Sequence, residues 1–216
     1  MMRFASQAIR RLLLPATLAA ACARPGAEPP VVRPAVATPA ATTPQRRYVA
    51  ADVRFMQHMI EHHGQALTMT ALVPERAASE AVRLMAQRIE VSQRDEIARM
   101  RRWLIERGEN VPGLDGAHQH HVTSDSGARM PGMLSRDELQ RLSESRGPEF
   151  DQLFLEYMIR HHEGALVMVS ELFATDGAGQ ELDIFRFASD VDADQRAEIR
   201  RMGLMRDQLP PAKPGP

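Results

Sequence analysis

Apolar residues recur every three or four positions along four long stretches of the chain. In the first stretch Phe55, Met59, Ala66 and Met69 fall on one face of a helix, and the stretch has no strand-like alternation. The other three stretches have the same period. The predicted helices span residues 52–73, 75–106, 149–174 and 179–208.

Residues that favour turns and helix ends lie between these stretches. Pro74 closes the first helix and is well placed at the start of the second, because proline fits the first turn of a helix. Gly108 occupies a C-cap position after the second helix. Ser135 and Glu138 match a capping box, which predicts a short extra helix over residues 135–145.

Two motifs occur twice, in the same order. The pattern Phe-x-x-x-Met-Ile-x-His-His-x-x-Ala-x-x-Met begins at Phe55 and again at Phe154, and Gln-Arg-x-Glu-Ile-x-x-Met begins at Gln93 and again at Gln195. Each half of the chain is therefore expected to form one helical hairpin, and the two hairpins are copies of the same unit. These features predict an all-α fold over residues 48–209, a four-helix bundle built from two repeated hairpins with a short connecting helix.

Both ends of the chain differ in composition from this region. Residues 1–21 combine three Arg with a short apolar run, which is typical of a signal peptide, and Cys22 follows where a lipoprotein signal is cleaved and the cysteine lipidated. Cleavage after an Ala-x-Ala site, giving a soluble product, stays open. Residues 22–47, rich in Pro and Ala, are typical of a disordered linker, and residues 210–216 of a disordered tail.

Composition narrows the possible functions. Lys and Arg total 27 and Asp and Glu 28, so the chain lacks the basic excess of a protein that binds nucleic acid. Loss of residues 1–21 would remove three Arg and no acid and leave a net charge of −4. A single cysteine excludes a disulfide framework and a cysteine-based zinc site. By contrast, 13 Met and 8 His accompany only 5% aromatic residues, so soft metal ligands are plentiful.

The first repeated motif brings these ligands to one helix face. Met59 lies one turn before His62 and His63, and His58 lies one turn before His62. Thioether sulfur favours Cu(I), and imidazole binds both oxidation states of copper, so the set indicates copper before zinc. The equivalent residues of the second copy are Met158, His161 and His162.

The second repeated motif places polar residues on a face that should be buried. Gln93 and Glu96 share a helical stripe with apolar residues, and Gln195 and Glu198 repeat this arrangement. Buried polar groups need hydrogen-bond partners. We expect Glu96 and Glu198 to accept the imidazole N–H groups of the facing helices and so to fix the orientation of the rings.

Other interpretations stay open. Methionine at helical spacing is often core filler, so a purely structural or partner-binding bundle with a polar interior is one alternative. A metalloenzyme is another, although no nucleophile is evident and no catalytic residue is predicted. The absence of any Glu-x-x-His sequence argues against a di-iron centre. A loop that could capture Cu(II) contains His118, His120 and His121.

At these residues the sequence resembles the DUF305 family, a bacterial group of exported, ferritin-like helical bundles. The resemblance rests on both copies of each motif and on the segment Met130–Ser135, and it covers residues 48–208. Members of the family have been linked to copper binding and copper tolerance in the periplasm. The resemblance implies a copper-binding role for Met59, His62, His63, Met69, Met158, His161, His162 and Met168.

The sequence therefore predicts an exported protein that faces the periplasm, anchored through lipid on Cys22. Its expected function is to sequester copper or to pass it to a delivery or efflux partner. Contact with a membrane is expected only through the lipid anchor, and none is expected with nucleic acid. His58 has no counterpart in the second copy, where Tyr157 takes its place, so two metal sites need not be equivalent.

Overall fold

The structure, a computed structural model, describes residues 48–113 and 130–209, all within one compact unit, Pro44–Pro216. The predicted signal peptide, Cys22, the linker and the C-terminal tail lie outside the described residues. The same holds for the loop histidines His118, His120 and His121.

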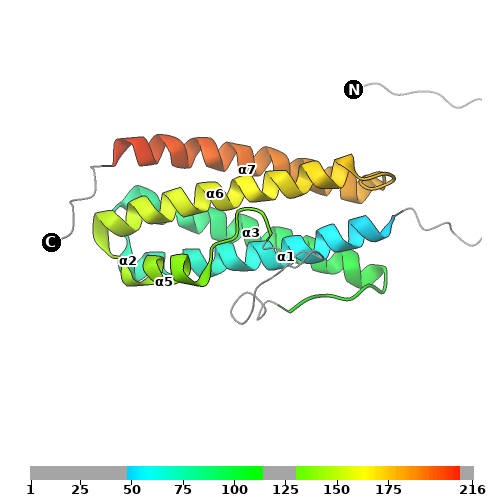
Figure 1. The fold of residues 1–216 in the computed structure, drawn as a ribbon, viewed down its shortest axis with the longest axis horizontal. Coiled ribbons are helices and arrows are strands. Elements are labelled where there is room, and N and C mark those ends of the chain that lie inside the picture. The colour runs from blue at the N-terminus through cyan, green and yellow to red at the C-terminus, as the bar shows by residue number, and fades with distance from the viewer. Residues whose placement is uncertain (1–47, 114–129, 210–216) are drawn as a thin grey trace, which may run out of the picture. The chain divides into compact units, whose positions relative to one another are not determined.

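The described residues form four long helices and two short ones. They are α1 Ala50–Thr70, α2 Val73–Arg76, α3 Glu80–Glu106, α5 Arg136–Glu144, α6 Gly147–Ala174 and α7 Leu182–Gln208. α1 and α3 form one hairpin, α6 and α7 form the other, and α1 packs along α6 (Figure 1). The predicted all-α four-helix bundle is confirmed, and the described ranges contain no strand.

The break between the first two long helices differs from the prediction. α3 begins at Glu80, not at residue 75, and Pro74 lies in the separate one-turn helix α2. Ser79 ends this break, because its hydroxyl accepts a hydrogen bond from the backbone N–H of Val82 at 3.4 Å and caps α3.

Two buried carboxylates, at equivalent positions of the repeat, tie each hairpin to the turn of the other. Asp52 in α1 accepts a hydrogen bond from the Gly179 N–H at 2.7 Å, in the turn before α7. Asp151 in α6 accepts hydrogen bonds from the N–H groups of Ser79 at 2.7 Å and Ala78 at 3.1 Å, before α3. These bonds replace the water that both carboxylates lose on burial. The two bonds to Asp151 explain why the chain stays extended ahead of α3.

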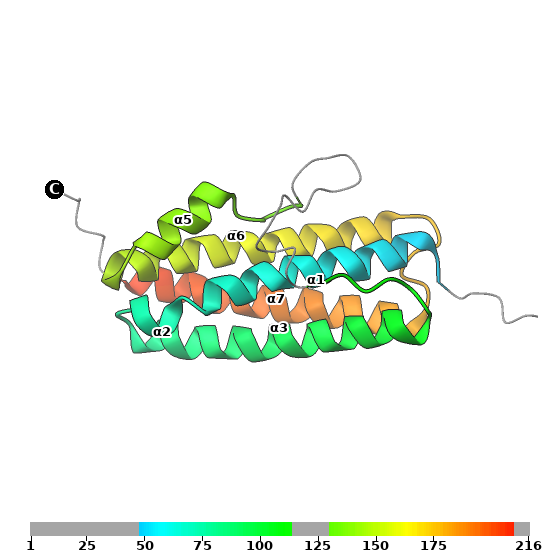
Figure 2. The ribbon, with the colours of Figure 1, turned by 90° about the horizontal axis from the view of Figure 1, so that it is seen from below.

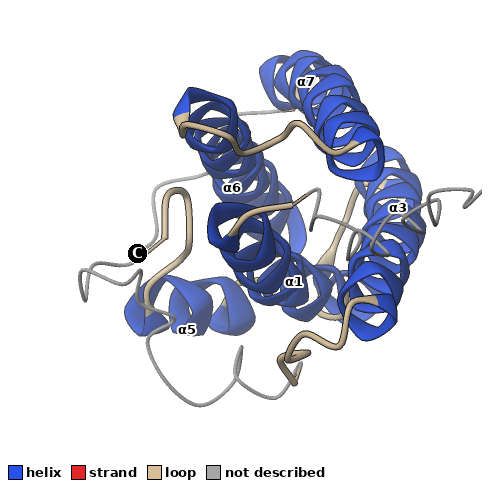
Figure 3. Ribbon diagram, turned by 90° about the vertical axis from the view of Figure 1, so that its right-hand side faces the viewer, coloured by secondary structure: helices blue, strands red, loops and turns tan. Residues whose placement is uncertain are grey.

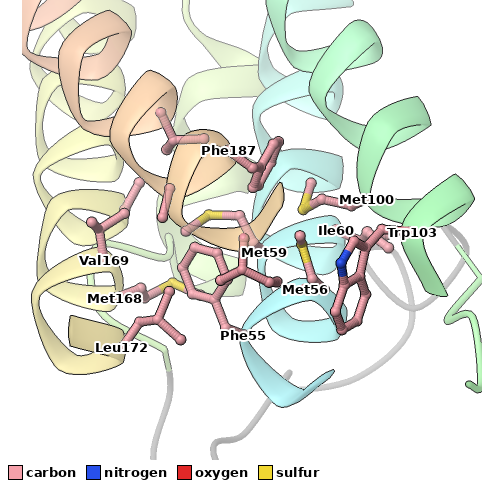
Figure 4. Close-up of a cluster of buried hydrophobic side chains, with 14 of the residues drawn as sticks. Phe55, Met56, Met59, Ile60, Met100, Trp103, Met168, Val169, Leu172 and Phe187 are labelled. Carbon is pink, nitrogen blue, oxygen red and sulfur yellow. The ribbon is translucent and has the colours of Figure 1, made fainter. Parts of the chain in front are cut away.

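The apolar faces of the helices form two core clusters. The first cluster, part of which Figure 4 shows, includes Met59 from α1, Met100 from α3 and Met168 from α6. The second cluster includes Met69 from α1, Met158 from α6 and Met202 from α7. Since the start of α1 shares a cluster with the end of α6, and the end of α1 with the start of α6, the two helices run antiparallel. Their midpoints therefore meet at the centre of the bundle.

Residues 130–134, here called the strap, lie across α1 and α6. Gln65 of α1 donates a hydrogen bond from Nε2 to the Leu134 carbonyl at 3.1 Å and accepts one from the Leu134 N–H at 2.7 Å. On the α6 side the fit depends on glycine, because a Cβ on Gly164 would overlap the carbonyl group of Pro131. Gly132, with φ of +74°, makes the turn of the strap at this contact.

The short helix α5 follows the strap and lies outside the bundle, beside α1 and α6 (Figures 2 and 3). Its predicted capping box is present: the Ser135 N–H donates to Glu138 Oε2 at 2.7 Å, and the Glu138 N–H donates to Ser135 Oγ at 3.2 Å. Arg160 of α6 donates to Glu138 Oε1 at 2.7 Å. Burial raises the pKa of Glu138, but the hydrogen bonds from Arg160 and Ser135 outweigh it and lower that pKa to about 2. The capping box and this ion pair dock α5 on α6.

Candidate metal centre

Four histidines gather where the midpoints of α1 and α6 meet. The rings of His62 and His161 lie close together in a tilted arrangement, with centroids 3.9 Å apart and planes inclined by 35°. His63 lies 6.3 Å from His62, and His162 lies 6.3 Å from His161, measured between ring centroids. All four side chains are buried. The two His-His pairs of the repeat thus form one group at the centre of the bundle, which we call the imidazole group.

The two outer rings of this group are held by carboxylates from α3 and α7. His63 Nε2 donates a hydrogen bond to Glu96 Oε2 at 2.5 Å, and His162 Nε2 donates one to Glu198 Oε2 at 2.6 Å. These are the Glu–His pairs that the sequence predicts. When Nε2–H donates to the carboxylate in a neutral ring, which is the form that binds metals, the lone pair lies on Nδ1.

The two inner rings are held neutral by burial. His62 Nε2 donates a hydrogen bond to the Pro131 carbonyl oxygen of the strap at 3.0 Å, which leaves its lone pair on Nδ1. Burial lowers the pKa of His62 to about 3; repulsion by His63 adds to this effect, and the bond to Pro131 opposes it. Burial, followed by repulsion from His62, also lowers the pKa of His161 well below its usual value. Neutral imidazole is the form that binds metals.

Each ring of the imidazole group has one buried nitrogen without a hydrogen-bond partner. The atoms are His62 Nδ1, His63 Nδ1, His161 Nε2 and His162 Nδ1. A buried polar atom left unpaired costs about 1–3 kcal/mol, so four in one place need a common reason. Gln93 and Gln195 are buried as predicted, and their Oε1 atoms also lack a hydrogen-bond partner.

The methionines of the repeated motif lie on both sides of the imidazole group. Met59 and Met168 belong to the first core cluster, and Met69 and Met158 belong to the second. The structure therefore divides the predicted sulfur ligands into two pairs, each made of one residue from α1 and one from α6. Every one of these side chains is buried, so their thioethers face protein instead of bulk water.

His58 does not join the imidazole group. It is half-buried and lines a cavity that opens beside the strap. At the equivalent position of the second half, Tyr157 is buried, with the Arg160 guanidinium 5.2 Å from its ring centroid. The two ends of the bundle therefore differ, as the replacement of His by Tyr indicates in the sequence.

Within residues 48–113 and 130–209, no three His, Cys, Asp or Glu side chains are placed so that they could hold a metal ion together. The donors that this centre offers are imidazole pairs with thioethers around them. Sequence reasoning missed the Pro131 carbonyl, because a backbone oxygen has no residue-type signal. The available hint was the pair Gly132 and Gly164, whose missing side chains admit the strap.

Comparison with known proteins identifies relatives of this fold. The family described as "Domain of unknown function (DUF305)" matches residues 52–206. A DUF305 fragment from Deinococcus radiodurans is 32% identical in sequence, covers 75% of this chain and 99% of its own, and superposes with a TM-score of 0.64. A DUF305 protein of Streptomyces coelicolor, predicted to be secreted, is 26% identical, with 76% and 98% coverage and a TM-score of 0.61.

More distant similarity extends to CopM. Its Cu(II)-bound and Cu(I)-bound structures are each 24% identical to this chain, cover 72% of it and 95% of CopM, and superpose with TM-scores of 0.57 and 0.56. At this identity the likeness shows the fold alone. Among curated proteins none matches the chain. The family match spans most of the sequence and confirms the resemblance seen in its motifs, so the chain belongs to the DUF305 family.

Proposed function

We propose that this protein binds copper ions inside the bundle, through the imidazole group and the thioethers on either side of it. The observation that carries the proposal is the set of four unpartnered ring nitrogens at the bundle centre. A metal ion would accept these lone pairs and remove the cost of leaving them unpaired. The proposed ligands are His62, His63, His161 and His162 with Met59, Met69, Met158 and Met168.

The chemistry of these donors favours copper over hard cations. Thioether sulfur binds Cu(I) well and Mg²⁺ or Ca²⁺ poorly, and imidazole binds copper in both oxidation states. Glu96 and Glu198 would hold the rings of His63 and His162 in a fixed orientation, as carboxylates commonly do for ligating histidines. Because burial keeps His62 neutral down to a pKa of about 3, its Nδ1 is ready to bind without first losing a proton.

Relatives of the same fold support copper as the ion. CopM has been crystallised with Cu(II), with Cu(I) and with Ag bound, and Ag(I) resembles Cu(I) as a soft ion. CopM is only 23% to 24% identical to this chain, so the ligands proposed above rest on the residues of this chain.

We place this activity in the cell envelope, as sequestration of copper or its transfer to a delivery or efflux partner. Support comes from the signal-like residues 1–21 with Cys22 and from the relative predicted to be secreted. No helix in the described part of the chain is long and apolar enough to cross a membrane. We propose a lipid on Cys22 as the membrane contact, because this cysteine follows directly on the signal-like residues 1–21.

Titration with Cu(I) in competition with a chromogenic chelator tests the proposal. The variant His62→Gln/His161→Gln keeps polar groups of similar size but removes two lone pairs of the imidazole group. The wild type should bind one equivalent of Cu(I) tightly at this site. We expect the affinity of the variant for this equivalent to be at least 100-fold lower, so that the equivalent is lost in the titration. The matched control is Met205→Leu, which changes a half-buried side chain elsewhere in the bundle, leaves the imidazole group complete and should retain that equivalent. Equal binding by wild type and the double variant would refute interior copper binding.

A further inference from the structure

A second group of soft donors lines a cavity of about 160 Å³ beside the strap. His58 of α1, Met130 of the strap and Met168 of α6 contribute to its wall, and Glu171 lies at its exposed edge. The three donor side chains come from three different segments of the fold. We call this cavity the outer pocket.

The side chains of the outer pocket suit a soft, singly charged metal ion. Met130 and Met168 are 3% and 6% exposed, so packing holds these two side chains in place in the wall of the cavity. His58 is half-buried and adds an imidazole, and two thioethers with one imidazole form a donor set that favours Cu(I). Arg54 and Glu171 contribute one charge of each sign to the wall, so donor softness, not net charge, would select the ion.

The outer pocket is connected to the imidazole group through two of its residues. Pro131, which follows Met130 and also lines the pocket, accepts the hydrogen bond from His62 at 3.0 Å. Met168 belongs to the same core cluster as Met59, the residue one turn before His62, and Figure 4 shows it beside Phe55 and Leu172, which also line the pocket. Met168 therefore both lines the pocket and packs in the core cluster that contains Met59.

We propose that the outer pocket is an entry site, which takes Cu(I) from solution through His58, Met130 and Met168 and passes it to the imidazole group. The transfer exchanges one neutral donor for another and requires neither redox change nor proton release. The handover rests on the proposed interior function, whereas capture of an ion in the pocket does not. The second half of the bundle has Tyr157 in place of His58, so entry is assigned to one end only.

Stoichiometry and loading rate together test the proposal. Cu(I), supplied as a complex with a weak chelator, is mixed with protein in a stopped-flow instrument, and bound copper is counted at equilibrium. The wild type should bind one ion more than His58→Gln/Met130→Leu, and this variant should load its interior at least tenfold more slowly. His58→Gln alone, at a half-buried site, repeats the measurement with little risk to folding. Met205→Leu is the matched control, because it removes a thioether from a different cavity.

The outcomes separate the outer pocket from the interior site. Unchanged stoichiometry or an unchanged loading rate in His58→Gln/Met130→Leu would overturn the entry site. If His62→Gln/His161→Gln still binds as many ions as the wild type, the interior function fails. Loss of one ion in each variant, with slow loading only in the pocket variant, supports both sites.

Discussion

Acid should destabilise the metal-free protein through its buried histidines. The His62 side chain has an ordinary pKa of 6.5 in the unfolded chain and about 3 in the folded protein. The unfolded state therefore binds a proton below pH 6.5 that the folded state does not accept. The contribution of neutral His62 to the free energy of unfolding is fully present above pH 6.5 and is lost as the pH falls towards 3. The same direction holds for His161, whose pKa is also lowered by burial.

The size of the effect follows from the width of this window. Each pH unit between the two pKa values changes the free energy of unfolding by about 1.4 kcal/mol. Between pH 7.5 and 5.0 only the part below pH 6.5 counts, so His62 alone should lower the free energy of unfolding by about 2 kcal/mol. That is a large share of the 5–15 kcal/mol typical of a folded domain. Burial raises the pKa of Asp151, which works in the opposite direction, but this contribution cancels when variants are compared with wild type.

Urea unfolding followed by circular dichroism at pH 7.5 and 5.0, with a chelator present, measures the loss. His62→Gln still offers a donor to the Pro131 carbonyl but cannot titrate, so its loss should be about 2 kcal/mol smaller than that of wild type. His58→Gln keeps both inner imidazoles and should lose as much as wild type. If His62→Gln and wild type lose equal stability, His62 is not held neutral by burial, and the reasoning fails.

Three further substitutions test individual contacts. Gly164→Ala should lower the free energy of unfolding, measured with urea, by about 1–3 kcal/mol, because the new Cβ would overlap the Pro131 carbonyl group. The control is Gly203→Ala, which should be neutral or stabilising because the space around its Cβ is open. Glu198→Gln should weaken Cu(I) binding about 10- to 100-fold in the chelator titration, because the amide holds the ligating ring less firmly. Asp151→Asn should cost about 1–3 kcal/mol, measured by the same unfolding, since one backbone N–H loses its acceptor; an unchanged midpoint would contradict this role.

The helices and part of the centre could be predicted because both leave periodic signals. Apolar spacing predicted the four long helices, and the second repeated motif predicted that Glu96 and Glu198 face the histidines. The start of α3 at Glu80 was missed although Ser79 is a local N-cap signal, whereas the hydrogen bonds that Asp151 of the other hairpin accepts from Ala78 and Ser79 could not be predicted. Contacts between distant segments have no local pattern.

The arrangement of ligands was likewise beyond periodicity. Helical spacing places His62 and Met59 on one face, but only the antiparallel packing of α1 and α6 brings His62 onto His161 and assigns Met59 and Met69 to different clusters. The departure of His58 from the buried group depends on its position at the edge of this face, where the outer pocket exposes it.

X-ray absorption at the copper K-edge of the Cu(I)-loaded His58→Gln variant tests the central claim most directly. This variant lacks the imidazole of the outer pocket but retains all four interior rings. The account predicts copper bound by imidazole nitrogen together with thioether sulfur, and loss of that signal when His62→Gln/His161→Gln is added. Copper surrounded by oxygen donors alone, or a spectrum that the added substitutions leave unchanged, would contradict binding at the centre of the bundle.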